Sequence, residues 1–150
     1  MLTLQVKTFQ ELTKEELYSL LQLRSQVFVV EQDCVYLDPD GKDQKALHVL
    51  GFKNKTLVAY TRCFKPGDYF KEASIGRVVV DRNQRKHRYG YQIMEASIAA
   101  IHTRFNTKKI KISAQTYLQK FYTNLGFKQT GTPYLEDGIP HIGMVLEGLR

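Results

Sequence analysis

The sequence has few cysteines, no long apolar run and no signal segment. Its two cysteines, Cys34 and Cys63, are too few for a disulfide framework and fit no paired metal-ligand spacing. We therefore expect reduced thiols, no bound metal and a cytoplasmic location. No apolar run approaches the roughly 20 residues that span a bilayer, and the N-terminal residues lack the apolar core of a signal peptide. These absences exclude a membrane protein and a small secreted protein held by disulfides.

The chain also lacks internal repeats, low-complexity tracts and linkers. Its 150 residues therefore predict a single domain that spans 1–150. A hydrophobic content of 43% with 25% charged residues is typical of a globular domain that needs no disulfide or metal for its core. The 22 Lys and Arg against 15 Asp and Glu give a net charge of +7. Nucleic-acid binding, an anionic cofactor or simple solubility would each explain that charge.

Periodicity predicts alternating strands and helices. Thr13 and Glu16 form a capping-box pattern ahead of a helix of about four turns, and Asn54 and Lys55 indicate a tight hairpin turn. Strands are expected at 2–9, 47–53, 56–63, 73–81 and 109–114, helices at 89–105 and 116–125, and two apolar stretches in 127–146 around a turn at 136–138. The acidic segment 31–43 is expected to be a loop or an irregular helix. This order predicts an α/β (α+β) fold with a central mixed sheet.

The most informative local motif is VVVDRNQRKHRYG at 78–90, a strand that leads through a basic turn into a helix. Because a helix N-terminus leaves backbone N–H groups unpaired, it attracts anions. Four cations lie on this turn, namely Arg82, Arg85, Lys86 and Arg88, and Gly90 permits a close backbone approach. The motif therefore favours a phosphate-bearing ligand, with a solvated basic turn as the alternative. Neither a Walker motif nor a dinucleotide fingerprint is present.

A second motif, QKFYTNLGF at 119–127, places a Phe-Tyr pair on a short helix before Gly-Phe and another strand. Taken alone, these aromatic residues fit an ordinary core. In this order and spacing, the two motifs together resemble the GNAT superfamily of acyl-CoA-dependent N-acyltransferases. The stretches 23–43, 75–80, 114–122 and 136–144 resemble the ElaA-like branch of that superfamily.

This resemblance implies a mixed, mostly antiparallel twisted sheet flanked by helices on both faces. It also implies transfer of an acetyl group from acetyl-CoA to a primary amine. The coenzyme would bind along the strand and turn that precede the second long helix and at one position beyond the next strand; the matching residues are Val78, Val79, Val80, Arg85, Lys86, His87, Arg88, Tyr89, Gly90 and Gln115. Arg88 and Lys86 replace glycines that are common in this turn, so each side chain would either crowd the pyrophosphate or supply charge to it.

The implied chemistry needs a general acid, a base and a donor to the thioester carbonyl. Tyr122 stands where many relatives have the acid, and a phenol is suited to protonate a thiolate because their reference pKa values are neighbours. A bulge in the strand of Val78–Val80 would expose a backbone N–H to the carbonyl. Candidate bases are Glu31, His48, Asp137 and His141; Glu31 and His141 are preferred because they lie within the branch-like stretches. The acidic segment 38–43 would either attract a cationic amine or simply be solvated.

Two alternative functions remain at this point. One is a GNAT-fold protein that binds acyl-CoA without turnover, and the other is a nucleic-acid-binding module that uses Arg82–Arg88. The second would need aromatic residues interleaved with the basic ones on one face, and the sequence shows none. The expected partners are therefore acetyl-CoA and an unidentified amine, with no nucleic acid and no membrane, in a monomer or a homodimer.

Overall fold

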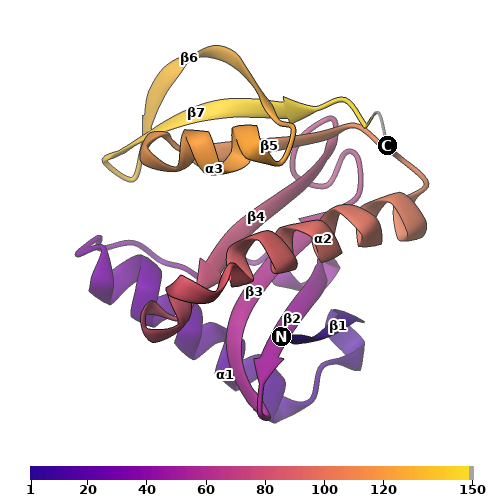
Figure 1. The fold of residues 1–150 in the computed structure, drawn as a ribbon, viewed down its shortest axis with the longest axis vertical. Coiled ribbons are helices and arrows are strands. Elements are labelled where there is room, and N and C mark those ends of the chain that lie inside the picture. Colours follow the sequence, from indigo (N-terminus) through magenta and orange to yellow (C-terminus); the bar gives the residue numbers. More distant parts are fainter. Residues whose placement is uncertain (149–150) are drawn as a thin grey trace.

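The computed structural model describes residues 1–148, which contain one seven-stranded sheet in the order β1-β2-β3-β4-β5-β7-β6. All neighbouring strands are antiparallel except β4 and β5. The strands are β1 Thr3–Thr8, β2 Leu47–Lys53, β3 Thr56–Phe64, β4 Ala73–Val80, β5 Ile110–Gln115, β6 Lys128–Glu136 and β7 Ile139–Leu146. The helices are α1 Lys14–Arg24, α2 Tyr89–Phe105 and α3 Gln119–Asn124 (Figure 1). In residues 1–148, no helix has the length and apolarity needed to span a membrane.

Helix α1 begins at the predicted capping box. The Thr13 hydroxyl accepts a hydrogen bond from the Glu16 backbone N–H, and the Glu16 carboxylate accepts one from the Thr13 N–H. These bonds pair backbone donors that a helix start would otherwise leave free. Beyond α1 the chain continues as a π-helical segment, Ser25–Glu31, which the sequence did not predict. The apolar side of this continuous helix packs against Leu50 and Tyr60 on one face of the sheet.

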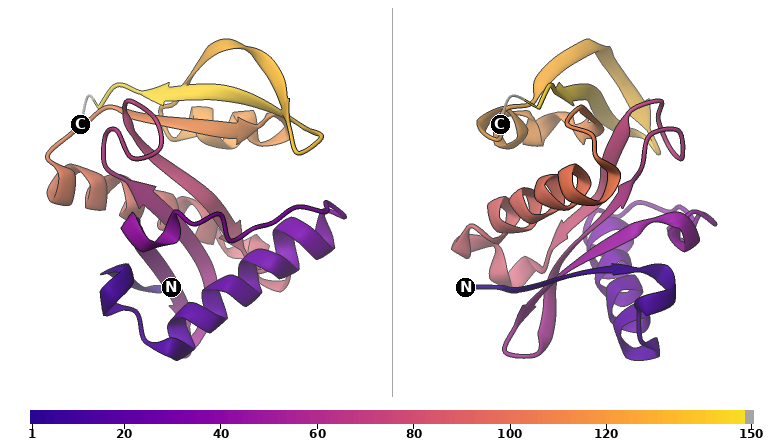
Figure 2. Two further views of the ribbon diagram at one scale, coloured as in Figure 1. Left: turned by 180° about the vertical axis from the view of Figure 1, so that it is seen from behind. Right: turned by 90° about the vertical axis from the view of Figure 1, so that its right-hand side faces the viewer.

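Helices α2 and α3 cover the opposite face. The bounds predicted for α2 are confirmed, and its buried side chains, among them Ile93, Met94 and Ile101, lie in the main core. Tyr122 of α3 and the following Phe127 belong to the same core. In the edge-on view of Figure 2, α1 and α2 lie on opposite sides of the sheet. The expected mixed sheet with helices on both faces is therefore confirmed.

Two tight turns have the backbone conformation that hairpins need. Asn54 and Lys55 join β2 to β3 with φ values of 50° and 72°, and Asp137 and Gly138 join β6 to β7 with 50° and 77°. Positive φ at both central residues matches the twist of the flanking strands. The hairpin turn predicted at Asn54 and Lys55 and the turn predicted at 136–138 are both confirmed.

The sheet opens between β4 and β5. The two strands pair only at Ala73 with Ile110 and at Ser74 with Lys111, and beyond these pairs they diverge (Figure 1). The register of β3 with β4 also shifts between Tyr60 and Arg62, and within that shift Arg77 has a φ of 50°. This irregularity is the bulge expected in β4, and it lies where the strands begin to separate.

Candidate active site

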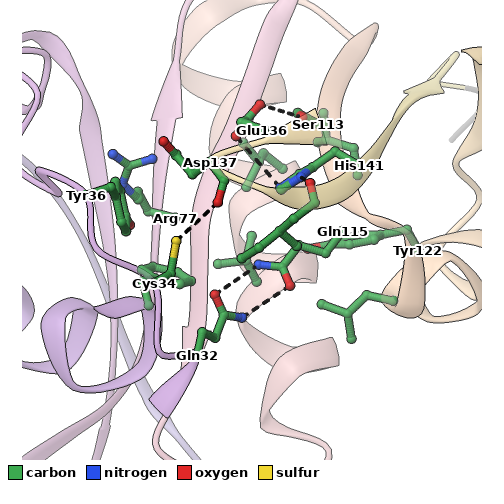
Figure 3. A pocket seen from close by; sticks show the side chains of 17 residues that line it. Gln32, Cys34, Tyr36, Arg77, Ser113, Gln115, Tyr122, Glu136, Asp137 and His141 are labelled. Atoms are coloured by element: carbon green, nitrogen blue, oxygen red, sulfur yellow. Dashed lines mark hydrogen bonds and ion pairs between the residues drawn. The ribbon is translucent and has the colours of Figure 1, made fainter. Parts of the chain in front are cut away.

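Two cavities meet where β4 and β5 diverge. The first, the basic cavity, has a volume of about 320 Å³ and is lined by β4, the basic turn, the first turn of α2 and α3, including Val78–Val80, Arg85, Arg88, Gly90 and Phe121. The second, the polar cavity, has a volume of about 100 Å³. Its polar lining comes from the segment after the π-helix, from β4, from β5 and from β6, β7 and the turn between them; these residues are Gln32, Cys34, Tyr36, Arg77, Ser113, Gln115, Glu136, Asp137 and His141 (Figure 3).

Several residues line both cavities and so mark their junction. They are Phe28, Gln32, Val78, Gln115, Leu118 and Tyr122. The side-chain amides of Gln32 and Gln115 are paired, with N–O distances of 3.2 and 3.4 Å between donor and acceptor (Figure 3). This pair connects the end of the π-helical segment to β5 across the opening of the sheet. The predicted coenzyme residue Gln115 and the predicted acid Tyr122 are thus brought together.

Tyr122 is fixed in position but keeps an available hydroxyl. Its ring packs edge-on against Phe121 and Phe127, with centroid distances of 4.9 and 6.1 Å. Burial raises the pKa of its phenol, and nearby Tyr117 adds to the shift. Within residues 1–148 no group forms a hydrogen bond with the hydroxyl. The phenol therefore stays protonated at neutral pH and can donate its proton to a group in either cavity.

His141 faces the polar cavity from β7, in register with Gln115 of β5. Its Nδ1 lies 2.7 Å from the carbonyl oxygen of Ile139. Because a carbonyl only accepts hydrogen bonds, Nδ1 carries the hydrogen, and in the neutral ring Nε2 keeps its lone pair. Nε2 is 3.7 Å from a carboxylate oxygen of Glu136. The Nε2 lone pair is therefore available to a donor in the polar cavity.

The sequence did not identify Gln32, Ser113 or Glu136 as site residues. The Ser113 hydroxyl donates a hydrogen bond of 3.1 Å to the Glu136 carboxylate and also bonds the Tyr134 hydroxyl. The period of two in a strand could have indicated Ser113, since it lies two residues before Gln115 and on the same face. No comparable signal exists for Gln32, whose place in the site depends on the π-helical segment.

The basic turn holds Arg88 in the conformation for which a glycine is common. Arg88 has a φ of 59°, in the left-handed region, and directly precedes α2. Its guanidinium lies 4.5 Å from the centre of the Tyr91 ring, so the side chain is turned along α2. A Cβ on Gly90 would come within 3.3 Å of the Phe121 ring, so this glycine permits α2 to pack against α3.

The other residues expected in the coenzyme loop are placed differently. Lys86 and His87 are exposed and do not line the basic cavity. Tyr89 is buried in the main core and does not line it either. Arg85, Arg88 and Gly90 are therefore the loop residues whose side chains or backbone face that cavity.

The four candidate bases differ in their hydrogen-bond partners and in whether they line a cavity. Arg85 forms two hydrogen bonds to the Glu31 carboxylate, of 2.5 and 2.8 Å, which hold the pKa of Glu31 below its usual value. Glu31 lines neither cavity. His48 is buried between the Tyr60 hydroxyl and the Asp43 carbonyl, and burial lowers its pKa. His141 and Asp137 line the polar cavity.

Both expectations for the acidic segment 38–43 are wrong, because its carboxylates are neither solvated nor free to attract an amine. Asp38 and Asp43 are buried and form ion pairs of 2.7 and 2.8 Å with Arg24. With the further ion pairs of Asp40, they make up an arginine–aspartate cluster consisting of Arg24, Arg62, Arg77, Asp38, Asp40 and Asp43. Three cations balance three anions, and the cluster fixes the segment after the π-helix against β3 and β4 as a wall of the polar cavity.

Neither cysteine forms a disulfide: Cys63 is buried, and Cys34 donates a weak hydrogen bond to the Asp137 carbonyl at 3.4 Å. In the described part of the chain, no group of three or more His, Cys, Asp or Glu residues is arranged to hold a metal ion.

Comparison with known proteins places these features in one family. A family model described as an acetyltransferase (GNAT) domain matches residues 5–148. The chain is 44% identical to protein ElaA of Escherichia coli over 142 residues, which cover 93% of each chain. The crystal structure of E. coli ElaA matches with a TM-score of 0.91 and 42% identity over 98% of this chain and 100% of that one. An acyl-CoA N-acyltransferase from Pseudomonas aeruginosa matches with a TM-score of 0.90 and 39% identity over 97% and 99%.

A more distant structure shares the fold alone. It is an aminoglycoside 6'-N-acetyltransferase complexed with coenzyme A, with a TM-score of 0.74 and 15% identity over 97% of this chain and 98% of that one.

Proposed function

Because this chain belongs to the GNAT acetyltransferase family, we propose that it transfers an acetyl group from acetyl-CoA directly to a primary amine. The observation that carries the proposal is the position of Tyr122, which lines both cavities where they meet. From there its phenol can reach a thioester held in one cavity while an amine approaches from the other. This arrangement brings the two reactants together without a covalent enzyme intermediate.

The basic cavity suits coenzyme A in shape and charge. Val78–Val80 and Phe121 give it apolar walls for a pantetheine chain, and Arg85 and Arg88 supply positive charge. The N-terminus of α2 adds unpaired backbone N–H groups beside these arginines, a favourable place for a pyrophosphate. The coenzyme A complex of the aminoglycoside acetyltransferase with this fold supports the assignment.

The polar cavity would hold the amine. The amine nitrogen forms a bond to the carbonyl carbon of the thioester, the carbon–sulfur bond breaks, and coenzyme A leaves as a thiol. Tyr122 donates a proton to the sulfur, and a base takes one from the nitrogen, so the protons balance. A backbone N–H at the bulge of Arg77 and Val78 would stabilise the negative charge on the carbonyl oxygen.

We assign the base to His141. Its Nε2 has a lone pair directed away from the Ile139 carbonyl, and it lies in the polar cavity with Glu136 nearby. Glu31 is a poor candidate, since Arg85 already neutralises its carboxylate outside both cavities. Asp137 lines the polar cavity but lacks an ordering partner for its carboxylate among the described residues.

The proposal is tested by following thiol release from acetyl-CoA in the presence of a panel of primary amines. We expect saturable turnover that depends on the amine. Tight acetyl-CoA binding without turnover would instead identify a binding protein that has lost catalysis. Binding to DNA or RNA with a steep salt dependence, in place of saturable acetyl-CoA binding, would identify the basic turn as a nucleic-acid site.

The choice of base is tested by two matched variants, His141→Gln and Glu31→Gln. We expect His141→Gln to lower kcat/KM by about 100-fold or more, the lower end of the range for removal of a general base. Glu31→Gln should keep turnover within about two-fold and should not weaken acetyl-CoA binding, because it releases Arg85 for the phosphates. A large loss of kcat/KM in Glu31→Gln, together with near-normal turnover in His141→Gln, would identify Glu31 as the base instead.

A further inference from the structure

A third cavity of about 50 Å³ adjoins the polar cavity, and we call it the side cavity. It shares Ile75, Gly76, Arg77, Ser113 and Glu136 with the polar cavity, so the two are neighbours along the opening between β4 and β5. The rest of its wall comes from β3, from the connection to β4 and from the start of β4; these residues include Arg62, Phe64, Tyr69, Phe70 and Ser74. None of the proposed chemistry takes place in this space.

Three buried polar atoms of residues that line the side cavity have no hydrogen-bond partner in the described chain: the Ser74 Oγ, the Arg62 Nε and the Arg77 Nε. The Arg77 Nε lies 2.8 Å from the Asp38 carboxylate in an ion pair, which leaves the Ser74 Oγ and the Arg62 Nε. Ser74 is 2% exposed and Arg62 is 1% exposed. More than nine in ten buried polar groups in proteins are paired, so two unpaired ones on the same small cavity are unusual. Each needs a partner from a bound molecule or from water.

The chemistry of these atoms restricts what the partner can be. An arginine Nε–H only donates, and a serine hydroxyl can donate, so the bound group must present an acceptor oxygen. The two arginines of the wall, Arg62 and Arg77, contribute no surplus positive charge. They belong to the arginine–aspartate cluster, in which three aspartates balance three arginines. Glu136 adds a negative charge where the two cavities meet, and the Lys111 ammonium, 5.1 Å from the centre of the Phe70 ring, adds a positive one. Because the charges around the side cavity balance, the group that fits is an uncharged oxygen.

Aromatic residues limit the size of the bound group. Phe64 and Tyr69 are stacked with a centroid distance of 5.2 Å, and Phe70 meets Tyr69 edge-on at 4.9 Å. The guanidinium of Arg62 lies over the Phe64 ring, 5.1 Å from its centre. These contacts hold the arginine and the rings in place. The space is therefore preformed and accepts a small substituent rather than a second ring.

We infer that the side cavity is a specificity subsite for the acceptor, in which Ser74 and Arg62 donate hydrogen bonds to a hydroxyl or carbonyl oxygen on the amine's own chain. The inference rests on the proposed acetyl transfer and narrows its substrates to amino alcohols and amino amides. Ser74 then determines specificity without taking part in proton transfer, because it lines neither of the cavities that contain Tyr122.

The test compares kcat/KM for matched acceptors: amino alcohols and amino amides of graded chain length against alkylamines of the same length. The wild-type protein should prefer at least one oxygen-bearing amine by about ten-fold, since buried polar groups left unpaired by the alkylamine penalise its binding. Ser74→Ala should reduce that preference to about two-fold or less while kcat/KM for the alkylamine changes by less than about two-fold. Ser19→Ala, the same change on α1, serves as the control and should leave the preference intact.

The outcomes separate the inference from the function on which it rests. Turnover without any preference, or a preference that survives Ser74→Ala, would show that water satisfies these atoms and would overturn the subsite alone. An equal loss of kcat/KM for both classes of amine would show that Ser74 has a structural role and would overturn the subsite. The melting temperatures of Ser74→Ala and Ser74→Cys would show whether the fold is destabilised. Failure to acetylate any amine would overturn the proposed function and the subsite together.

Discussion

Two groups of arginines border the site, and they use their charges in different ways. In the arginine–aspartate cluster, Arg24 and Arg62 are almost fully buried, and each forms ion pairs with two aspartates. In the basic turn, Arg82, Arg85, Lys86 and Arg88 are exposed, and among residues 1–148 only Arg85 of these four forms an ion pair. The cluster is neutral, whereas the turn holds four of the seven surplus positive charges. Balanced buried charge fixes a wall, whereas the charges of Arg82, Lys86 and Arg88 are exposed and unpaired among residues 1–148.

The largest effect should come from breaking the cluster. Arg24→Met would leave Asp38 and Asp43 buried without one of their partners, at a cost of about 3–5 kcal/mol in the free energy of unfolding. Urea unfolding measures this change. The matched variant Arg82→Met in the basic turn should alter stability by less than about 0.5 kcal/mol. Similar losses in the two variants would remove the distinction between the two groups.

The next effect should appear in coenzyme binding. Arg85→Gln removes a cation that lines the basic cavity, so the Kd for acetyl-CoA should rise about ten-fold, which corresponds to about 1.4 kcal/mol. The gain from a phosphate contact is limited because Arg85 must first leave Glu31. Calorimetric titration provides the measurement, with Arg82→Gln as the control that lies outside the cavity. An unchanged Kd for Arg85→Gln would indicate that this turn does not bind the phosphates.

The smallest effect concerns the backbone at Arg88. Arg88→Gly and Arg88→Ala remove the same charge, but only glycine adopts the left-handed conformation without strain. The glycine variant should therefore be more stable than the alanine variant by about 1 kcal/mol, while both bind acetyl-CoA with the same small loss of affinity. Thermal unfolding and titration of the two variants give this comparison. An alanine variant as stable as the glycine variant would contradict a strained backbone at this position.

The fold was largely predictable because its signals are local. Thr13 and Glu16 identify a helix start, Asn54–Lys55 and Asp137–Gly138 identify hairpin turns, and the apolar spacing of α2 gives both its ends. Each of these patterns depends on residues within a few positions of one another. The π-helical segment was missed because its run of Val27, Phe28, Val29 and Val30 contains no period that separates a π-helix from an α-helix.

The site was predictable only where a family motif contains it. Tyr122 and Arg85 were placed by resemblance, and both face a cavity. The partners that decide their surroundings lie far away in the sequence: Gln32 is 83 residues from Gln115, and Glu31 is 54 residues from Arg85. Neither prediction for the acidic segment, attraction of an amine or simple solvation, was right, because the sequence alone does not show that Arg24, Arg62 and Arg77 surround it. Such pairings arise only when the sheet forms.

The most direct test of the proposed transfer at the junction of the two cavities is Tyr122→Phe. The change removes one hydroxyl from a well-packed ring, so the fold and the basic cavity should be preserved. We expect kcat for thiol release to fall ten-fold or more while the Kd for acetyl-CoA stays within about two-fold of the wild-type value. Unchanged turnover in this variant, measured with the same amine, would contradict the account.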